Sequence, residues 1–122
     1  MSDYAAALAA TKQHYPFAGW MSYEDLEQYN EETCGAATEI FDRLISDLVA
    51  LGAQAPEKEK LGAFRRAVEA LNELNDENMG SFIETSEAEE LCGLCNIIAV
   101  AAGLDPEKYG GGEGPASEWR DW

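Results

Sequence analysis

The chain has 122 residues and a formal net charge of −16, with 24 acidic side chains against eight Lys and Arg. This length suits one domain, and a hydrophobic content of 46% favours a folded chain over a disordered one. Phosphate contacts require clustered Lys and Arg, and only Arg65 and Arg66 are adjacent. We therefore expect no nucleic acid and no anionic membrane among its partners.

Positive charges are missing from two long windows. Residues 13–42 hold seven acids and no Lys or Arg, and residues 67–107 hold ten acids and no Lys or Arg. Ordinary amphipathic helices mix Glu and Lys at four-residue spacing and gain stability from the pairs. A protein tolerates the resulting self-repulsion for solubility, or because the acidic face meets something positive.

The cysteines and the apolar segments indicate the cellular compartment of the protein. Cys34, Cys92 and Cys95 cannot all pair within the chain, which favours a reducing environment. Residues 1–10 lack the basic start and apolar run of a signal peptide, and the largely apolar run over residues 91–104 is too short to span a bilayer. We expect a cytoplasmic protein.

The first predicted element is a short Ala-rich helix over residues 3–14, capped by Ser2 and ended by Pro16. Residues 17–20 predict a loop. Ser22 and Asp25 have the spacing of a capping box, so a helix is expected from about Tyr23. The apolar stripe of this helix begins with Tyr23, Leu26 and Tyr29. After an uncertain junction at residues 30–33, the stripe continues with Ala37, Ile40, Phe41, Leu44, Ile45, Leu48 and Leu51.

A second firm helix is predicted over residues 57–75, after Gly52 and Pro56 mark a short connection between antiparallel neighbours. Residues 75–85 predict a loop. Ser86 and Glu89 then form the better capping box, opening a helix over about residues 87–102. Because this helix is apolar on nearly every side from Leu91 onward, it is expected to be the central element of a bundle.

The Gly- and Pro-containing segment 105–122 follows, with a flexible connector at residues 110–115 and Trp119 and Trp122 at its end. We expect this tail to fold back onto the body, with interface binding as the alternative for the two tryptophans. The pattern as a whole predicts one all-α domain over residues 1–122, a compact antiparallel bundle of four to five helices.

Chemical motifs are few. Cys92 and Cys95 have the spacing of a redox pair, but they fall inside the apolar helix behind three glutamates, which favours buried apolar cysteines over redox or zinc chemistry. Di-iron bundles need paired Glu-x-x-His motifs, and this chain has one histidine, His14. Residues 75–87 match a calcium loop only in part. We expect no metal, no cofactor and no catalytic residue.

The acidic windows carry the functional prediction. In charge and helicity the chain resembles small acidic immunity proteins that neutralise bacterial nucleases and proteins that mimic DNA, which implies a non-enzymatic inhibitor of a basic protein. The alternatives are a small enzyme or ligand-binding domain with a pocket near Trp20, His14 and the tail, and a homodimer. The expected partner-binding residues flank the loop between the last two helices: Glu69, Glu73, Asp76, Glu77, Glu84, Glu87, Glu89 and Glu90.

Overall fold

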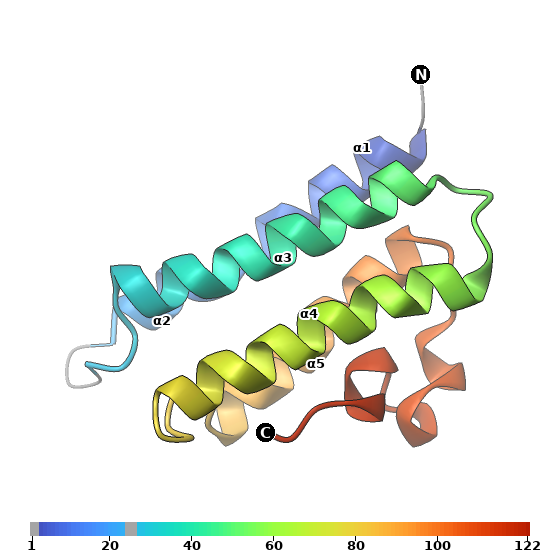
Figure 1. Ribbon diagram of the computed structural model, residues 1–122. Helices are drawn as coiled ribbons and strands as arrows, with labels where there is room; N and C mark the ends of the chain where they lie inside the picture. Colours follow the sequence, from blue (N-terminus) through green and yellow to red (C-terminus); the bar gives the residue numbers. More distant parts are fainter. Residues whose placement is uncertain (1–2, 24–26) are drawn as a thin grey trace.

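The structure is a computed structural model that describes residues 3–23 and 27–122. Its helices run alternately up and down in a four-cornered bundle (Figure 1). The first corner is a broken helix, in which a 3₁₀ turn joins two short α-helices. The elements are α1 (Asp3–Ala10), η1 (Thr11–His14), α2 (Phe17–Met21), α3 (Glu31–Leu51), α4 (Glu57–Glu77) and α5 (Thr85–Ala101).

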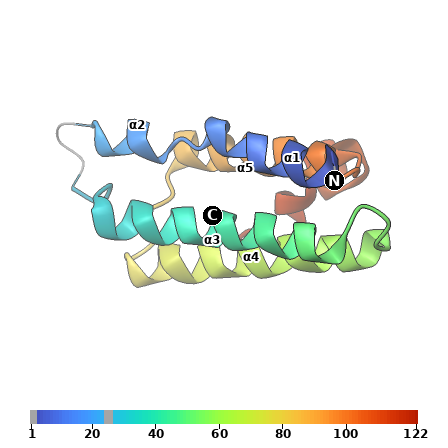
Figure 2. The ribbon, with the colours of Figure 1, turned by 90° about the horizontal axis from the view of Figure 1, so that it is seen from above.

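The bundle has two layers. Figure 2 shows α3 and α4 side by side in one layer, and α5 with the α1–α2 segment in the other. Each helix runs antiparallel to the one before it because the connections between the long helices are short. The predicted all-α antiparallel bundle is confirmed, and the described residues contain no strand.

The core runs along the axis between the two layers. Its large side chains come from every corner of the bundle, and the apolar positions predicted on α3 and α4 at three- and four-residue spacing supply many of them. The largest fully buried side chains include Trp20, Phe41, Phe64, Phe82, Leu8, Leu44, Leu48, Leu71, Leu91 and Ile98.

The segment before α3 differs from the prediction. Residues 17–20, expected as a loop, belong to α2, which buries Phe17 and Trp20. No helix begins at Tyr23: residues 27–30 form turns and bends, and α3 begins at Glu31. α3 begins after Asn30 because the Asn30 side chain accepts hydrogen bonds from the backbone amides of Glu32 and Thr33 and so caps the helix. The predicted roles of Ser2, Asp25 and Leu26 lie outside the described residues.

The connection between α4 and α5 is shorter than expected, because α4 continues to Glu77. α5 begins at Thr85, so the capping box predicted from Ser86 and Glu89 is wrong. Glu84 occupies the N-cap position without a side-chain hydrogen bond. α5 is also less enclosed than its composition indicates, since Val100 is 63% exposed. The reason is that α5 occupies a corner of the bundle and therefore keeps one face open to solvent.

The tail runs back beneath α4 and α5 (Figure 1) through three short 3₁₀ turns, η2 (Pro106–Lys108), η3 (Gly110–Gly112) and η4 (Pro115–Glu118). η4 packs against both helices and buries Pro115 and Ala116. Gly114 has a φ of +121°, and a Cβ there would meet the Asn96 side chain. Gly114, which the sequence places in a flexible connector, therefore allows the chain to approach α5 closely.

Candidate functional site

One end of the bundle collects half of the described carboxylates that have no ion pair. This is the end at which α2 and α4 finish and α3 and α5 begin (Figure 1). We call it the acidic end. It carries nine exposed acidic side chains on the turn before α3 and on the adjoining ends of α3, α4 and α5: Glu27, Glu31, Glu32, Glu73, Asp76, Glu77, Glu84, Glu89 and Glu90.

None of these nine carboxylates forms an ion pair with another described residue. The ion pairs in that part of the chain are Lys12–Asp42, Arg65–Glu69, Arg66–Asp47 and Arg120–Glu113, and they lie along the helices or in the tail. The carboxylates in the first turns of α3 and α5 gain some stabilisation from the helix dipoles. The acids at the end of α4 face the negative end of its dipole and gain none.

The eight residues predicted to bind a partner are distributed unevenly. Glu73, Asp76, Glu77, Glu84, Glu89 and Glu90 are exposed at the acidic end. Glu69 lies further back on α4 and pairs with Arg65 at 3.3 Å. Glu90 accepts a hydrogen bond of 2.6 Å from the indole nitrogen of Trp20. Glu87 is buried, with 5% of its surface exposed, because it faces the aromatic side chains between α2 and α5 rather than solvent.

Sequence reasoning missed the contribution of Glu27, Glu31 and Glu32 to the same surface. These acids belong to the first window without Lys or Arg, whereas the predicted partner-binding residues all belong to the second. The antiparallel course of α3, α4 and α5 brings the first part of one window and the middle of the other to the same end of the bundle. The available signal was the first window itself, combined with the expected up-and-down topology.

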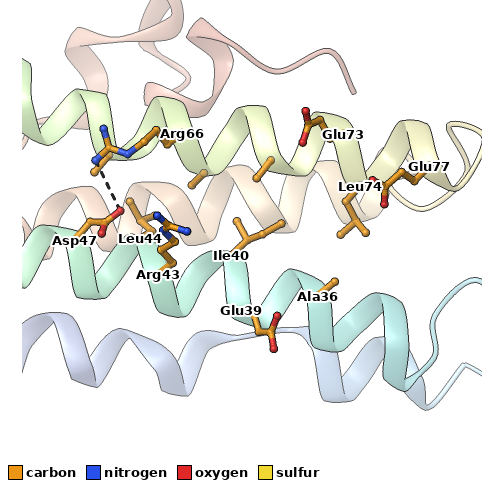
Figure 3. Close-up of a pocket in the computed structure, with 13 residues that line it drawn as sticks. Ala36, Glu39, Ile40, Arg43, Leu44, Asp47, Arg66, Glu73, Leu74 and Glu77 are labelled. Atoms are coloured by element: carbon orange, nitrogen blue, oxygen red, sulfur yellow. Dashed lines mark ion pairs between the residues drawn. The ribbon is translucent and has the colours of Figure 1, made fainter.

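A groove of about 620 Å³ runs between α3 and α4 on the outer face of the bundle (Figure 3). Its floor is made of small and aliphatic side chains, including Ile40 and Leu44. Glu73 and Glu77 lie toward the acidic end, whereas the other end holds Arg43 and Arg66, the latter 3.7 Å from Asp47. The two arginines of this groove therefore lie at one end, and Glu73 and Glu77 lie at the other.

A second hollow of about 930 Å³ lies at the start of α5. Tyr23 and the C-terminal residues Arg120 and Trp122 line it together with Glu84, Glu87 and Glu89. The pocket expected near Trp20, His14 and the tail is not this one, because Trp20 and His14 line neither hollow. Trp20 is 1% exposed in the core, and His14 is exposed on η1.

The cysteines have the environment that the apolar pattern indicates. Cys34 and Cys95 are buried, Cys92 is half-buried, and all three are free thiols. Burial raises the pKa of each thiol, most of all that of Cys95. A raised pKa keeps a thiol protonated at neutral pH, and the protonated form is a poor nucleophile and metal ligand.

Two further features of the described residues bear on function. Within residues 3–23 and 27–122, no three His, Cys, Asp or Glu side chains are grouped so as to hold a metal ion. In the same ranges, no helix has the length and apolar character that crossing a membrane requires.

Comparison of the chain with protein-family models, with curated proteins and with solved structures finds no match.

Proposed function

We propose that this protein binds a basic protein surface through its acidic end and blocks that surface, as a non-enzymatic inhibitor would. The observation that carries the proposal is the convergence of nine exposed carboxylates, free of ion pairs with other described residues, at one end of the bundle. Such a concentration of like charge creates a negative potential that attracts a positive patch and speeds encounter with it.

Rigid backbone holds this surface in place. Seven of the nine carboxylates are carried by the ends of three helices whose other faces are packed in the core, so little order has to be created there when a partner binds. The apolar floor of the α3–α4 groove lies beside them and offers surface for burial, which charge alone does not supply. A partner with basic residues around an apolar centre fits this combination.

A nucleic-acid-binding site on a protein has the complementary character, because it is built to neutralise phosphates with Lys and Arg. The resemblance to immunity proteins and DNA mimics in charge and helicity agrees with such a partner. We propose that occupation of this positive site by the acidic end excludes the partner's own anionic ligand.

The test is a capture experiment with matched charge variants. The full chain, the acidic-end variant Glu73→Gln/Glu77→Gln/Glu89→Gln and the opposite-end variant Glu57→Gln/Glu59→Gln/Glu107→Gln are immobilised and exposed to lysate at low and high salt. The two variants lose the same charge, from residues that are all exposed. We expect one basic protein on the wild type and the opposite-end variant, eluting as salt rises, and little on the acidic-end variant. Equal capture by both variants, or capture of nothing, would contradict the proposal.

A further inference from the structure

The groove between α3 and α4 carries different charges at its two ends (Figure 3). It is lined by side chains from residues 36–47 on α3 and from residues 63–77 on α4. At the helical rise, these stretches correspond to roughly 16 to 21 Å of helix. Glu73 and Glu77 lie at one end, and both arginines of the groove lie at the other. The groove is therefore long enough to hold a helical surface and has a defined direction.

The floor between the two ends is apolar and made largely of small side chains. Ile40, Ala36 and Ala70 are half-buried there, so they leave apolar surface for another molecule to cover. Ala63 and Ala67 lie deeper, and because their side chains are short, the side chains of another helix can enter the groove between α3 and α4. An apolar strip between charged ends is the composition of a protein interface with a polar rim.

The two arginines are available to acids from outside the chain. Arg43 is exposed and forms no ion pair with residues 3–23 or 27–122. Arg66 lies 3.7 Å from Asp47, but these side chains are 60% and 32% exposed. An ion pair this open to solvent contributes little to stability. Arg66 can therefore face a second acid while it stays beside Asp47.

The order of the charges selects the occupant. A uniformly basic segment laid along the groove would meet both arginines, and a uniformly acidic one would meet Glu73 and Glu77. A second copy of the chain, related by a two-fold axis perpendicular to the helices, presents the same groove in the reverse direction. The arginine end of each copy then lies against the Glu73–Glu77 end of the other, and each favourable contact occurs twice.

We propose that the α3–α4 groove is the interface of a symmetric homodimer. Arg43 and Arg66 of each copy pair with Glu73 and Glu77 of the other, and the two alanine-lined floors pack together. This inference goes beyond the proposed function and does not depend on it. The dimer interface and the acidic end share Glu73 and Glu77, so a second copy and a basic partner exclude one another at this surface.

The dimer is expected to be weak, because each copy carries a net charge of −16. Sedimentation equilibrium of the full chain is measured at about 0.15 M sodium chloride, where repulsion beyond about 8 Å is largely screened. We expect the mass to rise from 13.3 kDa toward twice that value, with a Kd on the order of 100 μM. A constant mass of 13.3 kDa up to about 1 mM protein would overturn the proposal and leave the groove to the basic partner.

Charge reversal tests the two-fold arrangement. The arginine-reversal variant is Arg43→Glu/Arg66→Glu, and the glutamate-reversal variant is Glu73→Lys/Glu77→Lys. Each variant alone places like charges opposite one another, so we expect its self-association to weaken at least about tenfold. An equimolar mixture restores opposite charges at both ends and should form a heterodimer with about the wild-type affinity. Self-association of both variants, or a mixture that stays monomeric, would overturn the proposal.

Two comparisons separate this pairing from an effect of net charge. The glutamate-reversal variant is less negative than the wild type, so a dimer limited only by overall repulsion would become tighter, whereas we expect a weaker one. The control Lys58→Glu/Arg65→Glu has the same net charge as the arginine-reversal variant, but its exposed residues lie on α4 outside the groove. It should dimerise more tightly than that variant, and equal affinities would overturn the proposal. Circular dichroism checks that all variants remain helical.

The arginine-reversal variant also separates the dimer from the proposed function. It keeps all nine carboxylates of the acidic end and lacks the competing second copy, so it should capture the basic protein from lysate at least as strongly as the wild type does. Capture of nothing by either chain, together with a wild-type dimer, would contradict the proposed function alone. Weaker capture by the variant would contradict the mutual exclusion of a second copy and a basic partner.

Discussion

Lys60 contacts three separate segments at the end of the bundle opposite the acidic end. It is 5% exposed, and its Nζ donates to the carbonyl oxygens of Ala53 at 2.9 Å and Ala102 at 2.8 Å. It also lies 5.1 Å from the centroid of the Tyr4 ring. Because Ala102 is the C-cap of α5, the ammonium group meets the negative end of that helix dipole. One cation thus joins the α3–α4 loop, α5 and α1.

Replacing Lys60 with methionine keeps the apolar stem and removes the charged donor from two buried carbonyls. We expect Lys60→Met to lower the free energy of unfolding by about 2 to 4 kcal/mol, measured by urea denaturation. Lys58→Met, at an exposed position on the same helix, should change it by less than about 0.5 kcal/mol. Similar effects of the two substitutions would mean that the Lys60 hydrogen bonds contribute little.

Tyr29 makes stability sensitive to alkaline pH. Burial first, and then the Glu87 and Glu84 carboxylates, raise its pKa above the ordinary value of 10.0. Below pH 10 the phenol is neutral in both the folded and unfolded chain, so it adds no pH dependence there. Above that pH the unfolded chain ionises first, and stability falls as pH rises. In Tyr29→Phe we expect a smaller loss of unfolding free energy between about pH 9 and 11. Parallel curves for variant and wild type would contradict this assignment.

At the scale of elements, Asn72 fastens the tail to α4. Its side-chain nitrogen donates to the Trp119 carbonyl at 3.0 Å, and its oxygen accepts from the Asp121 amide at 3.1 Å. Since both bonds join residues more than 40 positions apart in the sequence, they fix the tail in a way that no local propensity does. The tail in turn covers Cys92 and places Trp122 at the hollow.

Asn72→Ala should release the tail while leaving the bundle folded. We expect a loss of about 1 to 2 kcal/mol, with faster amide hydrogen exchange for residues 115–121 and unchanged protection in the middle of α3. A uniform loss of protection in all helices would show instead that the tail and the bundle unfold as one unit.

For the whole molecule, the dominant electrostatic feature is self-repulsion of a net charge of −16, with nine of the acids that have no ion pair gathered at one end. Screening by salt weakens repulsion between exposed charges. We expect the melting temperature to rise by about 3 to 5 °C between low and moderate sodium chloride concentrations. The acidic-end variant should melt higher than wild type at low salt and gain less from added salt. A flat response in the wild type would mean that the repulsion is already relieved by bound cations.

Much of the fold could be predicted from local patterns. The spacing of Phe41, Leu44 and Leu48 on α3 and of Phe64, Val68 and Leu71 on α4 predicted two helices and their buried faces, because a helical period of 3.6 brings such positions to one stripe. The junction before α3 was not predictable in the same way. Trp20 and Tyr29 are buried through contacts with Phe82, which is distant in sequence, so the chain there follows tertiary packing.

The candidate site was predictable in composition but not in arrangement. Six of the eight predicted residues are exposed at the acidic end, as their charge requires, since an unpaired carboxylate in the core is costly. Glu69 is exposed but lies further back on α4, and Glu87 is buried. Nothing in its local sequence distinguishes it from Glu89 or Glu90, and only the rotation of α5 against the aromatic cluster decides that it faces inward.

By itself, the sequence determined that the three long segments of α3, α4 and α5 are helical, which of their faces are apolar, and which stretches carry acids without bases, because these properties depend on neighbours along the chain. The tertiary structure decided where those stretches meet. Antiparallel packing brings nine acids from the two windows to one end and directs Lys60 to the other, and it turns the Glu87 side chain toward an aromatic hollow. The physical reason is that burial of the apolar stripes sets the order and rotation of the helices, and the charged side chains are carried to wherever that packing places them.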